Sequence, residues 1–479
     1  MNPGKYEAVI GLEIHVQLAT HTKMFCGCKL QFGAEPNTLT CPVCLGHPGT
    51  LPVANEMAVK YAIAAGLALG CSIAPRSMFH RKNYFYPDLP KGYQISQFDV
   101  PICSEGQLAG VRIHRAHMEE DAAKNIHVGD SGRIHGAGRT VVDYNRGGTP
   151  LVEIVTEPDI HSGAQAREWL QLLRATIKQL GISDVNMEEG SLRCDANISI
   201  RPFGQAELGT KTELKNMNSF RFIERGIDAE IVRQTALVEA GGSVIQETLH
   251  FDPSSGSLTS LRSKEEAHDY RYFPEPDLVP VVPSAELIEE VRASLPELPM
   301  QKAERYETEL GLAADTARFL AFRSEIGAYF EATLAAAGDG ADVKRVGDWV
   351  TGELVARIGA EDDPADSNVT PEALARVVAL VTEKKVTNAG AKTVLDKLVE
   401  GGGDPDAIVE SEGLAAIGDS DELAGIVEAA LEANPQAVEQ LKGGKDKAIG
   451  AIIGFVMKQT QGRADGGEVT RIVREKLEL

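Results

Sequence analysis

Residues 8–18 read Ala-Val-Ile-Gly-Leu-Glu-Ile-His-Val-Gln-Leu. Every second residue from Ile10 to Leu18 is apolar, and Glu13, His15 and Gln17 fall between them. Because neighbouring side chains of a strand point to opposite faces, this alternation predicts a half-buried strand with one polar face. Such strands are typical of an antiparallel sheet that packs one face on a core and leaves the other face polar.

The same pattern returns in three later segments, residues 112–121, 192–200 and 211–215. In the first of them alternation places Arg115, His117 and Glu119 on one side. If all these strands share a sheet, one face carries a mixed set of acids and cations: Glu13, His15, Glu119 or Glu120, Arg193, Asp195, Lys211, Glu213 and Lys215. Alternation alone favours an ordinary solvated face for this set.

The alternative interpretation of the polar face is a site for Mg²⁺ and a triphosphate, because carboxylates are hard oxygen ligands and cations stabilise phosphoryl groups. Standard motifs give no competing site. Residues 204–211 have the spacing of a phosphate-binding loop, but Thr210 precedes Lys211 where such a loop needs Lys before the hydroxyl. The sequence also lacks G-x-S-x-G and H-E-x-x-H.

Four of the seven cysteines form a cluster with the spacing C-x-C-x₁₂-C-x₂-C, namely Cys26, Cys28, Cys41 and Cys44. Two close pairs of thiols match a tetrahedral structural zinc site. A redox-active C-x-x-C is the lesser alternative, because no thioredoxin-like pattern surrounds Cys41. An odd cysteine count in a large chain argues against a disulfide framework.

Length and composition indicate a soluble protein of several domains. The 479 residues exceed one ordinary core, and 48 basic against 70 acidic residues give a net charge of −22. This charge disfavours a protein that coats nucleic acid through general basicity, although a local basic patch remains open. No run of 18 apolar residues and no secretion signal are seen, so we expect a cytoplasmic protein without membrane spans.

The composition changes along the chain and predicts three domains. Residues 1–283 are rich in strand patterns, Gly and Pro, which predicts an α+β domain with an antiparallel sheet and a zinc-binding loop. Residues 284–400 are helical in pattern and include the N-cap pair Thr370-Pro371. After the breaker cluster at 401–405, residues 401–479 predict a small all-helical tail domain.

The tail divides by charge. Residues 401–441 contain acidic residues and no Lys or Arg, whereas residues 442–479 contain eight Lys and Arg against five acids. Lys445 and Lys447 precede a helical pattern that includes Ile452 and Val456. Lysines at a helix N-terminus can hold phosphate, and composition alone favours a solvated helical surface instead.

Several stretches resemble the B-subunit family of the tRNA-dependent amidotransferases. They are residues 9–18, 81–88 (Arg-Lys-Asn-Tyr-Phe-Tyr-Pro-Asp), 92–97 (Gly-Tyr-Gln-Ile-Ser-Gln), 117–121 (His-Met-Glu-Glu-Asp), 145–151 (Asn-Arg-Gly-Gly-Thr-Pro-Leu), 187–197 and 269–277. The resemblance is collinear over essentially the whole chain.

The resemblance implies an ATP-dependent carbon–nitrogen ligase that uses glutamine as amido donor. ATP would phosphorylate the side-chain carboxylate of misacylated Glu-tRNA(Gln) or Asp-tRNA(Asn), and ammonia channelled from a glutaminase subunit would displace the phosphate. The implied partners are an amidase-type A subunit and a small C subunit in a heterotrimer, the misacylated tRNA, and additionally a non-discriminating aminoacyl-tRNA synthetase. The tail would contact the tRNA body.

The resemblance also assigns residues. It implies that His15, Glu120, Asp195 and Glu213 bind metal and that Glu120, Asp195, Glu213 and Lys82 serve the reaction, Lys82 at the ammonia path or the reaction site. Around ATP the resemblance implies His15, with Glu13 and Glu119 near it, and the alternation of the strands adds Arg193, Lys211 and Lys215. Its fold is an α+β cradle followed by helical domains, with ATP, Mg²⁺ and structural Zn²⁺ as cofactors.

Two other functions compete with this one. A non-catalytic, zinc-containing tRNA-binding scaffold would need no hard-metal ligands, so the acidic face disfavours it. An ATP-dependent ligase for a free amino acid would need no separate helical arm. The sequence leaves open whether Glu-tRNA(Gln), Asp-tRNA(Asn) or both are the substrate.

Overall fold

The structure is a computed structural model that describes residues 5–129, 137–263, 269–360, 362–417 and 420–479. The chain divides into two compact units, Met1–Pro299 and Met300–Leu479. The first combines helices with a largely antiparallel sheet and the second is helical, which confirms the predicted α+β class. The three-domain division at 283/284 and 400/401 stays a prediction. None of the helices built from the described residues has the length and apolar character needed to cross a membrane.

A nine-stranded sheet forms the centre of the first unit, in the order β13-β12-β11-β10-β1-β9-β6-β5-β2. All its neighbours pair antiparallel except β11 and β12, which are parallel. The strands are β1 (Tyr6–Gln17), β2 (Ser72–Ile73), β5 (Cys103–Leu108), β6 (Val111–Glu120), β9 (Pro150–Thr156), β10 (Leu192–Pro202), β11 (Thr212–Met217), β12 (Glu247–Phe251) and β13 (Leu258–Ser263).

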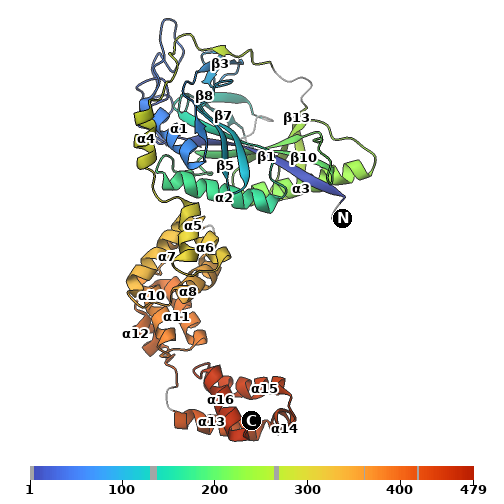
Figure 1. Cartoon of the computed structure of the whole chain (residues 1–479), viewed down its shortest axis with the longest axis vertical. Helices are drawn as coiled ribbons and strands as arrows, with labels where there is room; N and C mark the ends of the chain where they lie inside the picture. The colour runs from blue at the N-terminus through green and yellow to red at the C-terminus, as the bar shows by residue number, and fades with distance from the viewer. Residues whose placement is uncertain (1–4, 130–136, 264–268, 361, 418–419) are drawn as a thin grey trace. The chain divides into compact units, whose positions relative to one another are not determined.

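The strand predicted from residues 8–18 is β1, and it lies between β10 and β9. Its alternate residues Ile10, Leu12, Ile14 and Val16 are almost fully buried. Helices α2 (Gly163–Gln179) and α3 (Phe220–Glu239) cover this apolar face of the sheet (Figure 1). Burial of these aliphatic side chains stabilises the first unit and leaves the opposite face of β1 for polar residues.

The two covering helices begin at well-formed caps. The side chains of Ser162 and Ser219 each accept a hydrogen bond from the backbone N–H three residues later. Within α2, the apolar residues Trp169, Leu170 and Leu173 are buried. The indole Nε1 of Trp169 donates to the carbonyl oxygen of Leu108 at 3.0 Å, which joins α2 to β5.

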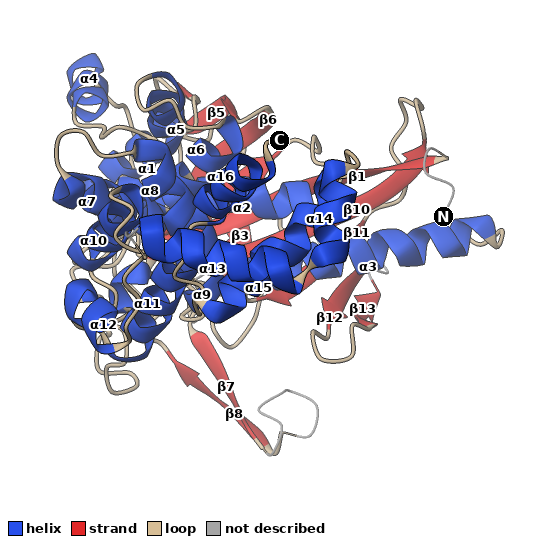
Figure 2. Cartoon of the chain, turned by 90° about the horizontal axis from the view of Figure 1, so that it is seen from below, coloured by secondary structure: helices blue, strands red, loops and turns tan. Residues whose placement is uncertain are grey.

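A small sheet of β14 (Phe273–Pro274), β3 (His80–Asn83) and β4 (Tyr93–Ser96) lies on the other side of the large sheet from α2 (Figure 1). The guanidinium of Arg81 donates twice to the carboxylate of Glu275, both at 2.7 Å, and so joins β3 to the segment after β14. Strands β7 (Lys124–Val128) and β8 (Arg139–Asp143) form a separate hairpin that extends from the rest of this unit (Figure 2). Two further helices are α1 (Glu56–Ala68) and α4 (Ala285–Ala293).

The second unit contains helices only, apart from one isolated backbone bridge between Val386 and Ala415 among its described residues. The predicted N-cap Thr370 and N1 Pro371 begin α10. The helices are α5 (Pro299–Thr308), α6 (Ala314–Ala321), α7 (Ser324–Ala337), α8 (Val343–Asp348), the π-helix η1 (Trp349–Leu354), α9 (Val355–Ile358), the 3₁₀ turn η2 (Pro364–Asp366), α10 (Pro371–Thr382), α11 (Asn388–Gly401), α12 (Pro405–Ser411), α13 (Ser420–Ala433), α14 (Pro435–Lys442), the 3₁₀ turn η3 (Asp446–Ala448), α15 (Ile449–Gln459) and α16 (Gly466–Leu477).

Candidate functional site

The four predicted polar strands belong to one sheet, as β1, β6, β10 and β11. The strand β9 lies between β1 and β6 and adds Glu153 to the same face. Glu153 is the cross-strand neighbour of His15 on one side and of His117 on the other. Glu13 is the cross-strand neighbour of Asp195 in β10. The register of these strands therefore brings the polar side chains together on the face opposite α2 and α3.

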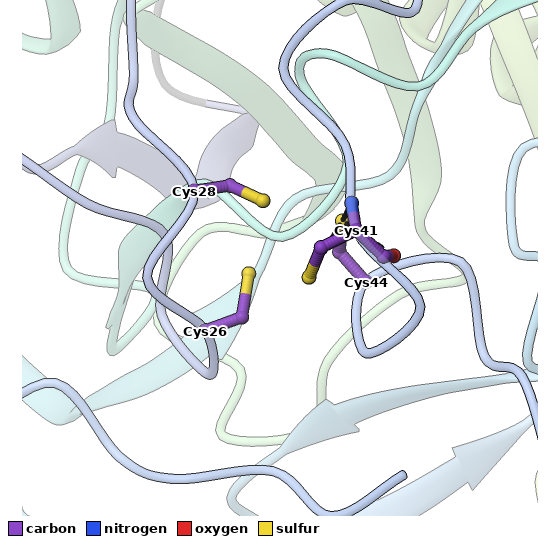
Figure 3. A group of neighbouring side chains, drawn as sticks. All are labelled: Cys26, Cys28, Cys41 and Cys44. Carbon is purple, nitrogen blue, oxygen red and sulfur yellow. Dashed lines mark hydrogen bonds between the residues drawn. The ribbon is translucent and has the colours of Figure 1, made fainter.

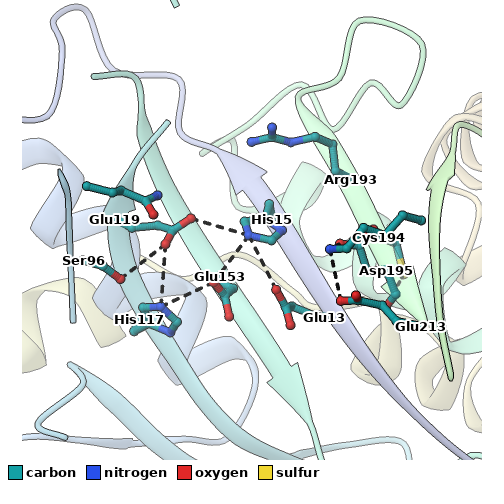
Figure 4. Close-up of polar contacts among 12 residues, drawn as sticks. Glu13, His15, Ser96, His117, Glu119, Glu153, Arg193, Cys194, Asp195 and Glu213 are labelled. Carbon is teal, nitrogen blue, oxygen red and sulfur yellow. Dashed lines mark hydrogen bonds and ion pairs between the residues drawn. The ribbon is translucent and has the colours of Figure 1, made fainter. Parts of the chain in front are cut away.

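The imidazole of His15 is the centre of the first group of side chains (Figure 4). Its Nε2 lies 3.4 Å from Glu153 Oε2, 3.5 Å from Glu119 Oε1 and 4.0 Å from Glu13 Oε1. His117 Nε2 lies 3.5 Å from Glu153 Oε2. Glu119, Glu153 and His117 are buried, so these charges act on one another with little screening.

Burial and mutual charge shift the pKa values of this group in opposite directions: those of Glu119 and His15 rise, and those of Glu153 and His117 fall. Burial and the nearby charge of Glu153 raise the pKa of Glu119 to about 7. Burial would also raise the pKa of Glu153, but His117 and His15 hold it well below its usual range. Burial lowers the pKa of His117 to about 4. Burial would lower the pKa of His15 too, but the hydrogen bond to Glu153 and the charge of Glu119 raise it to about 9.

A second group of side chains lies on β10 and β11, next to Glu13. Lys215 Nζ donates to Asp195 Oδ2 at 2.6 Å and lies 3.1 Å from Glu213 Oε1. Burial would lower the pKa of Lys215, but the charge of Asp195 raises it above its usual range. The hydroxyl of Thr248 on β12 donates to Glu213 Oε2 at 3.0 Å. The predicted residues Asp195, Glu213 and Lys215 are thus brought together.

Three other predicted site residues, Lys82, Arg193 and Lys211, belong to neither of these two groups. Lys82, on β3, has a pKa above its usual range: burial would lower that pKa, but the charges of Glu119 and other neighbours raise it. Its Nζ lies 5.0 Å from the centre of the Tyr270 ring. Arg193 donates to Asp121 Oδ2 at 3.0 Å, and Lys211 is exposed just before β11. Lys82 therefore faces the first group, whereas no direct contact ties Arg193 or Lys211 to it among the described interactions.

Glu120 is not brought together with His15, and this departs from the grouping that the family resemblance implied. Glu120 Oε1 accepts hydrogen bonds from Lys91 Nζ and, at 3.0 Å, from the backbone N–H of Ile95. Because Glu119 points toward His15, its neighbour in the strand points away. Glu120 instead lines a small cavity that Lys23 and Cys44 also line.

Glu153 is the site residue that sequence reasoning missed. It stands in Pro150-Leu-Val-Glu-Ile-Val-Thr156, a nearly continuous apolar run without alternation, and it is 5% exposed. A lone carboxylate within a buried strand is the signal that could have identified it, because Glu is almost never fully buried without a partner.

The first group, around His15, offers two overlapping donor sets for a hard cation. Donor atoms of Glu13, His15 and Glu153 lie within 4.8 Å of one another, and the same holds for His117, Glu119 and Glu153. Several carboxylates with one imidazole suit Mg²⁺ or Mn²⁺ better than a soft metal. A divalent cation would also offset the mutual repulsion of these buried carboxylates, so the residues present fit such an ion.

The four clustered cysteines form a third donor set, in the loop between β1 and α1 (Figure 3). Their sulfur atoms lie within 4.8 Å of one another. A hydrogen bond with Cys26 and the charge of Lys23 lower the pKa of Cys44 to about 4, and the backbone N–H of Cys41 donates to its sulfur at 3.2 Å. Four converging sulfurs fit a structural tetrahedral Zn²⁺.

Comparisons with known proteins agree across the whole chain. A family model described as GatB/GatE catalytic domain matches residues 8–289, and one described as GatB domain matches residues 328–477. The chain is 50% identical to the B subunit of the aspartyl/glutamyl-tRNA(Asn/Gln) amidotransferase of Anaeromyxobacter sp. (strain K), over 98% of this chain and 99% of that protein. The proteins of the same name from Geobacter sulfurreducens and Carboxydothermus hydrogenoformans are 49% and 48% identical, over 98% and 99% of this chain and 99% of each relative.

We predict that the chain purified under reducing conditions contains one zinc ion. Serine at Cys26, Cys28, Cys41 or Cys44 should release the ion, because the thiolate is the favoured ligand and binding is coupled to folding of the loop. Elemental analysis measures the ratio of zinc to protein. Cys71→Ala is the matched control, since Cys71 is buried outside the cluster and its loss should leave the zinc content unchanged. Zinc-free protein that keeps its fold would contradict this assignment.

We predict that His15 in the metal-free protein titrates near pH 9 rather than near its ordinary pKa of 6.5. The pKa of His15 is higher in the folded than in the unfolded chain, so protonation of His15 stabilises the folded state. This contribution to the free energy of unfolding is fully present below about pH 6.5 and is lost as the pH rises through about 9. It corresponds to at most about 3 kcal/mol. Histidine NMR across pH 5–10 measures the pKa, and Glu153→Gln should bring it down. A value near 6.5 in the unsubstituted protein would show that the carboxylates do not hold this proton.

Proposed function

This chain belongs to the GatB family of tRNA amidotransferase subunits, and on that premise we propose that it is the B subunit of a glutamine-dependent ligase that amidates misacylated Glu-tRNA(Gln), Asp-tRNA(Asn) or both. The names of its relatives support both substrates. Amidation converts the attached amino acid to glutamine or asparagine, so the enzyme serves protein biosynthesis.

The proposed chemistry has two steps. A carboxylate is a poor acyl donor, because its leaving group would be oxide. In the first step an oxygen of the side-chain carboxylate attacks the γ-phosphorus of ATP and ADP leaves. In the second step ammonia attacks the acyl carbon, phosphate leaves and the amide forms. Neither step needs a protein nucleophile, and phosphoryl transfer needs positioning and cations above all.

The observation that carries this proposal is the convergence of carboxylates, imidazole and ammonium groups on one sheet face. Glu13, His15 and Glu153 would hold one Mg²⁺, with Glu119 close by. When bound, the ion would supply charge stabilisation for the transferring phosphoryl group. Lys215 fixes the carboxylates of Asp195 and Glu213 next to Glu13 and limits their repulsion.

Lys82 provides the ammonium group that faces the first carboxylate group. Its charge is retained despite burial, because Glu119 and its neighbours favour the charged form. An ammonium group in this position can orient the substrate carboxylate or the phosphoryl oxygens. Glu120 points away from His15 and accepts a hydrogen bond from Lys91, so we assign Glu120 no phosphoryl contact.

The acidic face also distinguishes this function from its competitors. A scaffold that only binds tRNA has no need of buried, mutually repelling carboxylates, which cost stability unless a ligand offsets them. A ligase for a free amino acid would not explain a second unit of about 180 residues, Met300–Leu479.

The same family membership supports the partners. We propose an amidase-type A subunit that releases ammonia from glutamine, a small C subunit, the misacylated tRNA and a non-discriminating aminoacyl-tRNA synthetase that produces it. The ammonia would reach the sheet face through a channel. Because translation occurs in the bacterial cytoplasm, we place the complex there.

The tail is the proposed contact for the tRNA body. Helices α13 to α16 have a hydrophobic core of their own, which includes Leu423, Val427, Ile452, Val456 and Val473. Lys442, Lys445 and Lys447 are exposed just before α15. Exposed ammonium groups beside a helix N-terminus suit phosphates of a folded RNA.

We predict that Asp195→Asn, Glu213→Gln and Glu153→Gln each abolish ATP-dependent phosphorylation in the assembled complex. Each change keeps the side chain's size and removes a charge at the metal and phosphoryl site, which should cost several kcal/mol of transition-state stabilisation. Transfer of radiolabelled phosphate from ATP to the charged tRNA is measured, together with glutaminase activity. Glu7→Gln is the matched control, because Glu7 lies on β1 but pairs with Arg201. Normal phosphate transfer by the Asp195 and Glu213 variants would mean that the reaction occurs elsewhere.

We predict that the tail contributes affinity for tRNA and not chemistry. A chain ending at Ile417 keeps α12 and its ion pair between Arg376 and Asp406, but loses α13 to α16. Its complex should bind charged tRNA more weakly at moderate salt and keep its tRNA-independent glutaminase activity. Replacing Lys442, Lys445 and Lys447 by Gln should reproduce part of this loss and lower the salt dependence of binding by about 0.7–0.9 per phosphate contact.

The matched control for the lysine variant is the replacement of Lys344, Lys384 and Lys397 by Gln. These lysines are exposed in the same unit but lie outside the tail. Equal losses in both triple variants would indicate general charge rather than a binding surface. Unchanged affinity of the truncated complex would remove the tail from the tRNA contact.

A further inference from the structure

Three polar side chains are fully buried on the apolar face of the large sheet, away from the proposed reaction site. They are Glu230 and Gln234 on α3 and Thr212 on β11, and each is 0% exposed. Glu230 and Gln234 continue the buried stripe of α3 that Ile223 and Ile227 begin, so apolar residues would be expected at both positions. A buried carboxylate is costly unless several hydrogen bonds satisfy it, which makes its presence here informative.

The carboxylate of Glu230 holds the first residue of β11. Its Oε1 accepts hydrogen bonds from the Thr212 hydroxyl at 2.7 Å and from Gln234 Nε2 at 2.8 Å. Gln234 Nε2 also donates to Thr212 Oγ1 at 2.9 Å and to the carbonyl oxygen of Ile198 on β10 at 3.1 Å. The partly exposed Arg233 donates to both carboxylate oxygens of Glu230, at 2.7 and 2.9 Å. The network therefore ties the start of β11 to both α3 and β10.

The backbone ladder of β11 is irregular at this place. Its pairing with β10 shifts register between Cys194 and Ala196, with one residue more in β11 than in β10. On its other side β11 pairs in parallel with β12, and parallel pairs are slightly less stable than antiparallel ones. The connection that leads to β11 is exposed over residues 202–208. A strand with a bulge and an exposed approach needs a further contact to fix its register.

Register matters in β11 because alternate residues face the proposed reaction site. Thr212 points to α3, so its neighbour Glu213 points to the opposite face, where Lys215 contacts both Glu213 and Asp195. Resting on the proposed function, we propose that Glu230 is a positioning residue that fixes Glu213 and Lys215 at the phosphoryl site through Thr212. Glu230 touches no substrate, since the sheet lies between it and that face.

Hydrogen bonds suit this task better than apolar contacts. Burial of apolar surface is not directional, so it holds a strand against a helix without selecting one register. A hydroxyl placed between a carboxylate and an amide is satisfied at one position along the strand, and a slip of one residue would bring Glu213 into the core. The network therefore selects one register, which apolar residues at these positions would not do.

The test compares Thr212→Val, Thr212→Ser and Thr176→Val in the complete complex with charged tRNA and glutamine. Thr212→Val keeps the branched shape and removes the hydroxyl, so the kcat of ATP-dependent phosphorylation should fall about 10–100-fold, as expected for a misplaced site group. The KM for charged tRNA and the tRNA-independent glutaminase activity should stay unchanged. Thr212→Ser keeps the hydroxyl and should keep kcat. Thr176→Val is the matched control, because Thr176 is 1% exposed and its hydroxyl donates to Leu172 within α2.

A second variant separates positioning from plain stabilisation. Thr212→Val, Glu230→Met and Gln234→Met combined remove the three buried polar side chains together, and Arg233 keeps its contact with Glu247 at 3.5 Å. Replacing all partners of a buried network by apolar groups can leave stability unchanged. We expect a normal urea midpoint of unfolding and a kcat as low as that of Thr212→Val. A kcat equal to that of the unsubstituted complex would overturn the proposal.

Hydrogen exchange gives a readout independent of activity. The backbone N–H groups of β11 should exchange faster in Thr212→Val, while those of β1 and β9 keep their rates. Unchanged exchange in β11, an unchanged kcat, or a loss of kcat only in variants that have lost their fold would overturn the assignment. Faster exchange in β11 together with normal phosphate transfer by Glu213→Gln would instead uphold the register role of Glu230 and refute the proposed function of Glu213.

Discussion

The N-terminal unit depends on how it compensates the charges of Glu13, Glu119 and Glu153 around His15. These carboxylates converge on one imidazole, and Glu119 and Glu153 are almost wholly removed from water. Burying uncompensated carboxylates costs several kcal/mol each. In the metal-free protein the proton held on His15 and the ammonium of Lys82 therefore help to make the arrangement stable. A bound cation would take the place of that proton, because a ligating imidazole must be neutral.

Strand register is what makes this compensation possible. His15, Glu153 and His117 are direct cross-strand neighbours on three consecutive strands, β1, β9 and β6. A slip of one residue would turn each of them into the apolar core under α2 and α3. The apolar alternation of β1, which buries Ile10, Leu12 and Ile14, therefore fixes the site as strictly as it fixes the fold.

This coupling explains what could be predicted from sequence. The polar faces of β1 and β10, which include Glu13, His15 and Asp195, could be predicted from regular alternation. A strand that is buried on one face only alternates apolar and polar residues along the sequence. Glu153 could not be predicted in this way, because the residues before and after it in β9 are apolar and show no alternation. The family resemblance grouped Glu120 with His15, although alternation from Glu119 places the two side chains on opposite sides. Lys82 approaches the site from β3, outside the large sheet, and no local sequence pattern indicates that approach.

The basic residues of this acidic chain are gathered in local groups rather than spread evenly. A net charge of −22 would repel a polyanion if it were spread evenly, and the potential decays over about 8–10 Å at physiological salt. What a phosphate meets is therefore set by its nearest side chains. In the N-terminal unit Arg115, Lys82 and Lys215 stand among the acids, and in the tail the lysines follow a stretch without basic residues. An acidic protein can in this way bind both a nucleotide and an RNA, because each anion meets a local group of cations and not the average charge.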